Sequence, residues 1–310
     1  MNQDTKLERL LEVQVRRSRI IFRYTSMALA VCAALLAVPG ARGETDVAQN
    51  DKPIIGINMD VQAGSPETFR ILPDYVNAIT KSGGIPIVIP PMPEKECAEL
   101  VSRLDGVMMI GGNDYPPALY KQEAHKTSVP MVETRSNFDM LLVKEVLKDG
   151  KIPFLGICAG CQALNIGSGG SLVQDIPSHF KDSKVQHASP RGWQEGFNKH
   201  VVKAEEGTKI SKIIGQDGLK VVTSHHQCVD KVGEGLRVAA RTDDGVIESV
   251  EAKDKDFVVG VQWHPERDFE TNQKLFKEFI QQGQRRKAAR SAEQVSQSTK
   301  DDSTSRAKLQ

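Results

Sequence analysis

The residues best suited to do chemistry in this 310-residue chain lie in the stretch 154–165, which has the sequence FLGICAGCQALN. A short apolar run ends at Cys158, small residues flank this cysteine, and a helix-like pattern follows. Glycine and alanine allow a sharp turn that lifts a side chain to the end of a strand. Because the dipole and the unpaired N–H groups of a helix N-terminus stabilise a thiolate, Cys158 is a candidate nucleophile.

Two other interpretations of Cys158 remain open from this stretch alone. A free cysteine is often a small buried hydrophobic residue without a chemical role. Cys158 and Cys161 also form a C-x-x-C pair, which is typical of disulfide redox proteins. Only the rest of the chain distinguishes these interpretations.

A histidine and a glutamate follow a second apolar run, in the stretch 258–266, VVGVQWHPE. His264 and Glu266 are two residues apart, so on an extended segment their side chains point to the same side, and Pro265 stiffens the backbone between them. A carboxylate near Nδ1 holds an imidazole in one tautomer, and the imidazole can then move a proton from a nucleophile to a leaving group. Taken alone, His-Pro-Glu could also be an ordinary turn.

A pair of glycines, Gly111 and Gly112, follows a third apolar run. A bare N–H in this loop, together with the N–H of Ala159, would make a two-donor oxyanion hole, in which each donor is worth roughly 3–4 kcal/mol in acyl transfer. The alternative is a plain tight turn.

Short apolar runs alternate with amphipathic helical patterns in the part of the chain that positions these residues. The expected strands are 53–59, 86–91, 106–110 and 153–157, and the expected helices are 68–82, 94–104 and 133–148. Strands that are apolar throughout are typical of a parallel sheet covered on both faces, so the pattern predicts a doubly wound, mostly parallel α/β fold. Sites in such folds lie outside the carboxyl ends of strands, where the candidate residues stand.

The pattern changes after residue 170. Residues 237–241 and 246–252 flank the turn sequence TDDG and predict an antiparallel hairpin added to the sheet. Another strand is expected at 258–263, and a closing helix at 270–281.

Together, these motifs resemble the class I glutamine amidotransferase superfamily and, within it, the γ-glutamyl hydrolase branch that includes γ-glutamyl-γ-aminobutyrate hydrolase-type peptidases. GICAGCQ at 156–162 matches the nucleophile elbow G-[IV]-C-x-G-x-Q, and GVQWHPE at 260–266 matches the histidine motif. GGND at 111–114, with PALY at 117–120, is similar to the oxyanion loop of the branch. The stretches 169–176, 224–227 and 235–238 also fit, and the resemblance extends from about residue 53 to residue 279. It implies a flavodoxin-like fold.

The resemblance implies roles for individual residues. Cys158 would be the nucleophile, His264 the acid/base and Glu266 its orienting partner. Gly112 and Ala159 would supply the oxyanion N–H groups. Substrate contacts are expected from Gln162, Gly111, Asn113, His225 and His226, although for the two neighbouring histidines a hydrogen-bonded structural pair is about equally compatible with the sequence.

The chain departs from the pattern of the branch at three places. Ala159 stands where arginine often follows the nucleophile, which keeps the N–H donor but removes a charge. Val222 and Thr223 stand where Asn-Ser is usual, and Ser136 and Asp139 replace the usual Asp and Glu near Arg135.

The implied activity is hydrolysis of a γ-glutamyl amide or isopeptide bond through a thioester on Cys158, with a small γ-glutamyl molecule as the substrate and no metal or organic cofactor. The alternative is a glutaminase that supplies ammonia to a partner synthetase. A C-x-x-C redox protein is less favoured, because such a protein needs neither the His-Pro-Glu motif nor the Gly-Gly loop. A homodimer is compatible with the sequence. With a net charge of +1 and no basic face with interleaved aromatic residues, no nucleic-acid partner is expected.

Both ends of the chain are expected to lie outside the hydrolase domain, which spans 53–281. In residues 1–43, Arg16, Arg17, Arg19 and Arg23 precede the apolar run 27–38, and small residues follow it, as in a signal peptide. The run is short for a bilayer span, so a cleaved signal and export to the periplasm or the exterior are favoured over an uncleaved membrane anchor. Residues 44–52 are expected to be a linker, and the polar stretch 282–310 a disordered tail.

Overall fold

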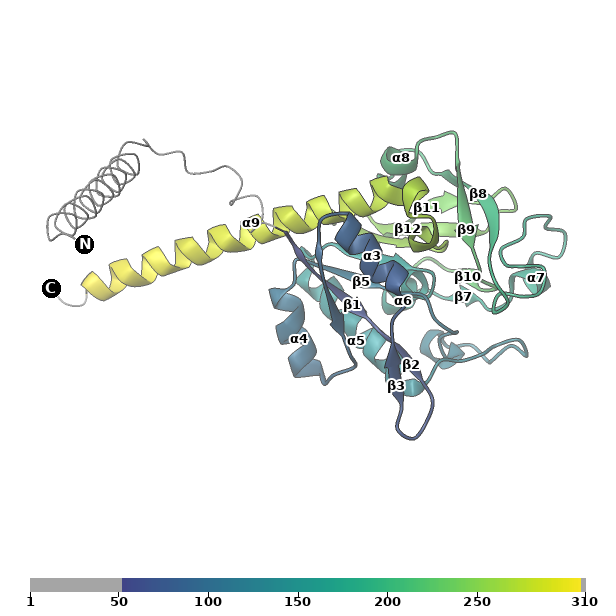
Figure 1. Cartoon of the computed structure of the whole chain (residues 1–310), viewed down its shortest axis with the longest axis horizontal. Coiled ribbons are helices and arrows are strands. Elements are labelled where there is room, and N and C mark those ends of the chain that lie inside the picture. The colour runs from purple at the N-terminus through teal and green to yellow at the C-terminus, as the bar shows by residue number, and fades with distance from the viewer. Residues whose placement is uncertain (1–51, 308–310) are drawn as a thin grey trace, which may run out of the picture. The chain divides into compact units, whose positions relative to one another are not determined.

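The computed structural model describes residues 52–307, with side chains described to residue 294. Its centre is a mixed eleven-stranded sheet (Figure 1) in the order β4-β1-β5-β6-β13-β12-β11-β8-β9, with β10 paired to β12 and β7 paired to β10. The first five strands in this order are parallel to one another: β4 (Ile85–Ile89), β1 (Ile54–Asn58), β5 (Gly106–Met109), β6 (Phe154–Ile157) and β13 (Val258–Val261).

The other six strands form the antiparallel part: β12 (Ile247–Ala252), β11 (Leu236–Arg241), β8 (Asn198–Ala204), β9 (Leu219–Thr223), β10 (Cys228–Val229) and β7 (Leu172–Val173). The predicted hairpin is confirmed, because β11 and β12 pair antiparallel across the expected turn. Strands β8 and β9 were not expected from the sequence.

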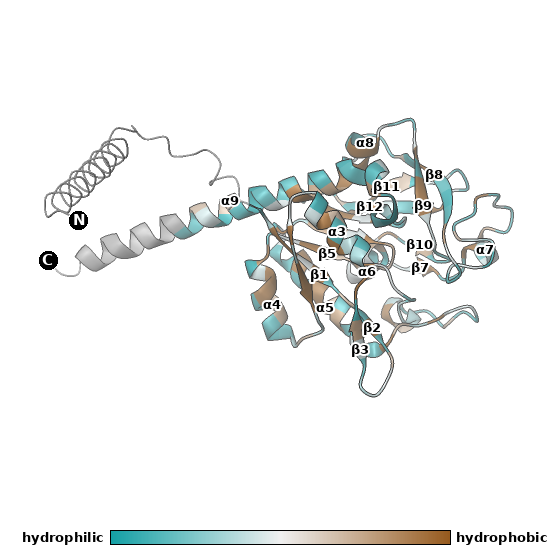
Figure 2. Cartoon of the chain, viewed as in Figure 1, coloured by the Kyte–Doolittle hydropathy of each residue, from teal (hydrophilic) through white to brown (hydrophobic). Residues whose placement is uncertain are grey.

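Helices cover both faces of the sheet, as the doubly wound prediction requires. One buried cluster joins the sheet to α4 (Glu94–Arg103), α5 (Glu133–Asp149) and α6 (Ala159–Gly167). A second cluster joins it to α3 (Pro73–Lys81), α8 (Lys209–Ile214) and the first turns of α9 (Phe269–Ala307). The central strands are mostly hydrophobic (Figure 2), which is expected of strands buried on both faces. The remaining helical segments are short: α7 (Ile176–His179) and the 3₁₀ turns η1 (Pro117–Tyr120) and η2 (Pro265–Asp268).

The expected helix 68–82 begins later than predicted. Residues Thr68–Arg70 form β3, which pairs with β2 (Asp60–Gln62) in a separate two-stranded sheet. The helix starts at Pro73, and Leu72 before it is extended, with φ −81° and ψ 139°. Proline favours the first helical position and disfavours helical geometry in the residue before it, so Pro73 sets the boundary.

Helix α9 corrects the expectation of a disordered tail from residue 282, because it continues to Ala307. Arg286 donates to both carboxylate oxygens of Asp149, at 2.8 and 2.9 Å, and to the carbonyl oxygen of Leu104. Arg290 lies 3.1 Å from a carboxylate oxygen of Asp105. The prediction counted only apolar residues and therefore missed these arginine contacts, which hold polar helical turns against the domain.

The predicted signal peptide (1–43) and, apart from Lys52, the predicted linker (44–52) lie outside the described residues. Within residues 52–307, no helix has both the length and the apolar character needed to cross a membrane.

Three neighbouring strands position the predicted site. β5, β6 and β13 lie side by side in the sheet and run in the same direction. Gly111, Cys158 and His264 follow their carboxyl ends, so the topology brings the three sequence motifs to one edge of the sheet.

Candidate active site

Cys158 lies between the end of β6 and the start of α6, in the predicted strand–turn–helix position. Its φ of 51° and ψ of −105° fall in a region that residues with a side chain avoid, so the surrounding structure must hold the strain. The Cys158 N–H donates to the carbonyl oxygen of Val261 at 2.8 Å. A Cβ on Gly156 would lie only 2.4 Å from the carbonyl oxygen of Gly160, so the turn requires glycine there. The result is a thiol presented at the end of the strand.

His264 and Glu266 lie together beside this turn. Nδ1 of His264 is 2.8 Å from Oε1 of Glu266, and both side chains are buried. Both residues were expected on an extended segment, whereas η2 begins at Pro265, directly after His264. The turn still brings the carboxylate to Nδ1, which leaves Nε2 as the nitrogen free to exchange a proton with a nucleophile.

The electrostatics of His264 favour the charged imidazolium. Burial lowers its pKa, but the charge of Glu266 and the neighbouring Cys158 raise it by more, to about 10. A histidine that is protonated at neutral pH can stabilise a thiolate and can later donate its proton to a leaving group.

The loop after β5 approaches the same point. A Cβ built on Gly111 would lie 3.0 Å from Cε1 of His264 and 3.6 Å from Cβ of Cys158, so the bare backbone fits between the two side chains. The Gly111 N–H donates to the hydroxyl of Tyr75 at 3.2 Å. No hydrogen bond within residues 52–294 uses the N–H of Gly112 or that of Ala159, so both donors are available to an oxyanion.

A buried polar network supports this loop. Asn58 accepts from the N–H of Ile110 at 2.8 Å and donates to Asp139 at 2.7 Å. Asp139 also accepts from Nε of Arg135 and from the hydroxyl of Tyr115, each at 2.6 Å. The two oxygens of Asp139 therefore accept from Asn58, Arg135 and Tyr115. Through Asn58, the carboxylate holds the backbone of Ile110 at the start of the loop.

Sequence reasoning missed most of this network and the hydroxyl of Tyr75. Asp139 stands out in the sequence only as a departure from a family pattern, and nothing there marks Asn58 or Tyr115 as its partners. Two features of the sequence could have indicated the network. Asn58 is the single polar residue at the end of the apolar strand β1, and Arg135 and Asp139 are oppositely charged residues four apart in α5, a helix that packs on the sheet.

Two glutamines lie beneath the nucleophile. Nε2 of Gln262 is 3.6 Å from Sγ of Cys158, and Nε2 of Gln162 is 3.3 Å from Oε1 of Gln262. Gln162 is buried and also lies 3.5 Å from the carbonyl oxygen of Gln227. The structure therefore places Gln162 in a chain of amides under Cys158, and not among the residues that line the cavity.

A cavity of about 450 Å³ opens beside Cys158 and His264. Gly111, Gly112 and Asn113 line it, as the sequence analysis expected for a substrate-binding loop. Ile110 of the same loop and residues from four other parts of the chain complete the wall: Asp60, Arg70, Leu72, Tyr75, Trp193, Gln194, Gly196, Phe197, Ser224 and Arg267.

The neighbouring histidines have different surroundings, and neither lines this cavity. His226 lies 3.1 Å from Asp114 and stacks on Trp193, where it lines an adjacent cavity of about 540 Å³. His225 is almost fully buried, donates through Nδ1 to the carbonyl oxygen of Gln227 at 2.9 Å, and has a pKa that burial lowers to about 4.

Cys161 lies below the elbow, away from the cavity. It is fully buried, and its Sγ would lie 2.8 Å from a Cβ built on Gly260. Burial raises the pKa of this thiol far above its usual value. Cys158 and Cys161 are both free, so nothing in their placement favours the C-x-x-C redox interpretation.

Comparisons with known proteins show what the chain is similar to. A model of the peptidase C26 family matches residues 53–266. A Mycobacterium tuberculosis protein assigned by its name to the glutamine amidotransferases is 34% identical over 236 residues, which are 74% of this chain and 74% of that protein. The γ-glutamyl-γ-aminobutyrate hydrolase PuuD of Escherichia coli is 30% identical over 244 residues, covering 74% of this chain and 93% of the relative.

One solved structure is similar in fold. A Thermoplasma acidophilum protein assigned by its name to GMP synthase aligns with a TM-score of 0.52 and 16% identity, covering 77% of this chain and 98% of that protein. The likeness confirms the predicted class I glutamine amidotransferase-like fold.

Proposed function

The chain belongs to the peptidase C26 family, and on that premise we propose that it hydrolyses γ-glutamyl amide or isopeptide bonds with Cys158 as the nucleophile. The observation that carries the proposal is that Cys158 and His264 line one cavity, with Glu266 2.8 Å from Nδ1 of His264. A strained cysteine at a helix N-terminus beside a histidine oriented by a carboxylate is suited to nucleophilic catalysis.

The first half of the reaction forms a thioester. The Cys158 thiolate attacks the δ-carbonyl carbon of the γ-glutamyl group, and the N–H groups of Gly112 and Ala159 donate to the resulting oxyanion. The imidazolium of His264 gives its proton to the departing amine as the C–N bond breaks. The products of this step are a free amine and a γ-glutamyl thioester on Cys158.

The second half releases glutamate. The now neutral His264 takes a proton from water, and the hydroxide formed attacks the thioester carbonyl. The C–S bond breaks, glutamate leaves, and the thiolate–imidazolium pair is restored. Glu266 keeps the imidazole in one orientation through both steps.

Charges on the cavity wall suit the polar end of a γ-glutamyl group, which carries an ammonium and a carboxylate. Asp60 and Arg70 both line the cavity, and a guanidinium nitrogen of Arg70 lies 3.1 Å from a carboxylate oxygen of Asp60. We assign Asp60 to the ammonium and Arg70 to the carboxylate. Asp60→Asn should then raise KM more than it lowers kcat, because the contact is made before and during the reaction.

The test is a panel of γ-glutamyl amides assayed for glutamate release, with Cys158→Ser as the inactive variant. Cys97→Ala is the matched control, because Cys97 is buried in α4 and burial raises its pKa to about 11. Loss of glutamate release in Cys158→Ser but not in Cys97→Ala supports the proposal. Full activity in Cys158→Ser would overturn it.

A glutaminase that passes ammonia to a synthetase is the second candidate, favoured by the name of the Mycobacterium tuberculosis relative. The same panel separates the two. A hydrolase of the proposed type cleaves γ-glutamyl amides of larger amines without a partner, whereas a glutaminase prefers glutamine itself and responds to a partner synthetase.

We also propose that residues 1–43 direct export. The observation in support is the order of arginines, apolar run and small residues at 41–43. Recovery of the protein outside the cytosol with a new N-terminus near residue 44 is the expected result. A protein that stays in the cytosol at full length would contradict it.

A further inference from the structure

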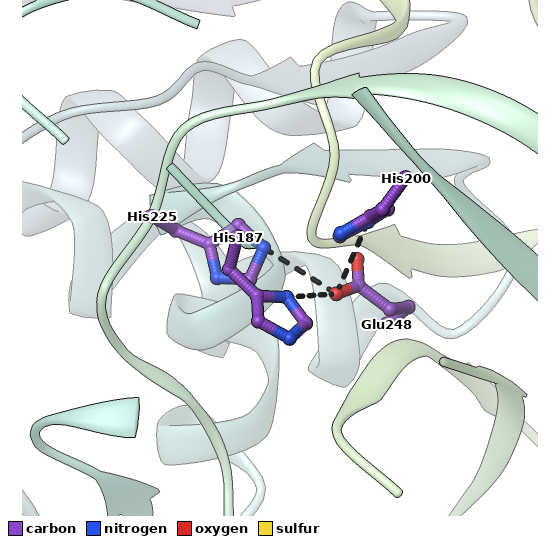
Figure 3. A group of neighbouring side chains, drawn as sticks. All are labelled: His187, His200, His225 and Glu248. Carbon is purple, nitrogen blue, oxygen red and sulfur yellow. Dashed lines mark hydrogen bonds and ion pairs between the residues drawn. The ribbon is translucent and has the colours of Figure 1, made fainter. Parts of the chain in front are cut away.

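A second cluster of reactive side chains lies apart from the cavity. His187, His200, His225 and Glu248 point toward one another from separate parts of the chain (Figure 3). Each offers one ligand atom, all four of these atoms lie within 4.8 Å of one another, and the side chains are 0–5% exposed. His200 is on β8, Glu248 is on β12, and the other two lie in the segments before β8 and after β9.

The distances from the Glu248 carboxylate to the three imidazoles are close to those between neighbouring ligands of a four-coordinate metal site. Oε1 of Glu248 lies 3.1 Å from Nδ1 of His187, and 3.4 Å from Nε2 of both His200 and His225. Zinc bonds of about 2.1 Å in tetrahedral geometry put neighbouring ligand atoms about 3.4 Å apart. Three imidazoles and one carboxylate are also a donor set that zinc prefers.

The outer contacts fix two of the histidines in the tautomer that a metal requires. His187 places Nε2 3.0 Å from a carboxylate oxygen of Asp244, so this nitrogen carries the proton and Nδ1 faces Glu248 with a lone pair. His225 places Nδ1 2.9 Å from the carbonyl oxygen of Gln227, which directs the lone pair of Nε2 toward Glu248. Metal-binding histidines characteristically donate their other N–H in this way.

Several buried atoms of the cluster lack hydrogen-bond partners, although Nδ1 of His187 lies within hydrogen-bond distance of Oε1 of Glu248. Among the described side chains, the buried atoms without one include both ring nitrogens of His200, Nε2 of His225 and Oε2 of Glu248. Imidazole lone pairs that face a carboxylate oxygen repel each other unless a cation or a proton lies between them. The two charges of a zinc ion would be balanced by Glu248 and Asp244.

We propose that His187, His200, His225 and Glu248 bind one zinc ion. With four protein ligands the site is closed, which is typical of structural zinc and assigns the ion no part in the hydrolytic reaction. His187 precedes and His200 on β8 closely follows a loop, 188–197, that supplies Trp193, Gln194, Gly196 and Phe197 to the cavity. The zinc would therefore hold both ends of the loop that forms one wall of the active site.

The site also connects to the nucleophile through the sheet. The carbonyl oxygen of Glu248 accepts from the N–H of Gln262 at 2.7 Å, and the Gln262 amide lies 3.6 Å from Sγ of Cys158. His225 follows Ser224, whose hydroxyl lies 2.6 Å from the carbonyl oxygen of Trp193 in the cavity loop. Zinc binding would thus stabilise the wall and the floor of the active site together.

The experiment measures zinc directly and does not depend on hydrolysis. Untagged full-length protein carrying Cys158→Ser, so that the thiol cannot bind metal, is treated with a chelator, desalted and titrated with zinc by calorimetry. We expect one zinc per chain and a higher melting temperature with zinc. His200→Ala and Glu248→Gln in this background should bind at least 100-fold more weakly, and Asp244→Asn should bind 10–100-fold more weakly because it loosens the tautomer of His187.

The control is His179→Ala, which removes an exposed histidine from α7 and should bind zinc as the parent does. A second measurement is the zinc content of the parent protein purified from zinc-supplemented cells. Because it uses no variant of the cluster, its result does not depend on whether such a variant folds. Folded parent protein that contains no zinc and takes up none would overturn the proposal and show that protons alone occupy the cluster. Equal binding by the parent, His200→Ala and Glu248→Gln would also overturn it.

Discussion

Two places in this molecule pair histidine with a buried glutamate, and they differ in what the histidine faces. At the first, His264 contacts Glu266 through Nδ1 and lies beside a thiol at the wall of a cavity. At the second, three histidines surround Glu248 and lie away from that cavity. The first arrangement leaves one nitrogen to exchange protons with a substrate, whereas the second directs every ligand atom inward.

The difference shows that two properties decide what histidine and glutamate do together: whether the histidine faces a cavity, and how many histidines surround the carboxylate. One carboxylate and one histidine beside a thiol form a proton-transfer device. Three histidines around one carboxylate, two of them with the outer nitrogen already held, form a binding site for a cation. Variants that separate catalysis from metal binding test this comparison.

The largest effect is expected for His264→Ala. Removing the acid/base should lower kcat for γ-glutamyl amides by about 10³-fold or more, because the proton for the leaving amine then has no donor. Zinc binding should be unchanged, since His264 is not part of the cluster around Glu248. Steady-state kinetics and calorimetry on the same preparation check both statements, and a loss of zinc binding together with activity would contradict the separation of the two sites.

Glu266→Gln should act through the protonation of His264. The negative charge of Glu266 helps to raise the pKa of His264 to about 10, against burial, so wild-type kcat/KM should fall as the pH rises through about 10. Without that charge the pKa is lower, and the alkaline limb should move toward neutral pH, with kcat reduced by about 10²-fold. The pH profile of kcat/KM provides the measurement. An alkaline limb at the same pH in both proteins would show that Glu266 does not set the proton affinity of His264.

Gly111→Ala should reduce kcat/KM by about 10–10²-fold, because the methyl group would lie 3.0 Å from Cε1 of His264 and 3.1 Å from the Tyr75 hydroxyl and would displace the imidazole. Gly112→Ala is the matched comparison, since its methyl group would meet Arg135 only at 3.7 Å and the N–H donor is kept. The loss should therefore be smaller for Gly112→Ala. A larger loss there than at Gly111 would mean that the backbone of Gly112 has no room for a side chain once substrate is bound.

The sequence carried most of the information on the parallel half of the fold and on the catalytic motifs. The apolar runs that form β1, β5 and β6 are short and continuous, so their type and order could be predicted. Cys158, His264 and Glu266 lie in local motifs whose chemistry is visible within a few residues. The antiparallel strands β8 and β9 were missed, because in β8 exposed and buried residues alternate and no apolar run marks it.

What the sequence could not supply is the contact between distant segments. Asn58 reaches Asp139 across 81 residues, and His187 reaches Glu248 across 61. Neither pair has a spacing that predicts it, because only the register of the sheet brings the segments together. For the same reason the sequence left open whether His225 contacts the substrate or has a structural role, because its partners lie on β12 and in the segment before β8.

Asp139→Asn tests the network beneath the oxyanion loop and should act on stability. The carboxylate accepts from Asn58, Arg135 and Tyr115 in a fully buried position, so an amide group would face donors and leave the Arg135 charge without its closest partner. Breaking a buried pair in this way costs about 3–5 kcal/mol of unfolding free energy. Tyr115→Phe removes only one donor and should cost about 1 kcal/mol. Equal losses in chemical denaturation would show that the carboxylate is not the centre of the network.

The smallest effect is expected where α9 contacts the domain. Arg286→Ala removes two hydrogen bonds to Asp149 and one to the carbonyl oxygen of Leu104. Because the pair is partly exposed and screened by water, the loss in unfolding free energy should be only about 1 kcal/mol, and neither kcat nor zinc binding should change. Denaturation midpoints, kinetics and calorimetry on one preparation test this. A change in either functional quantity would show that α9 beyond residue 281 influences the two histidine sites, which its contacts with Asp149 and Leu104 give no reason to expect.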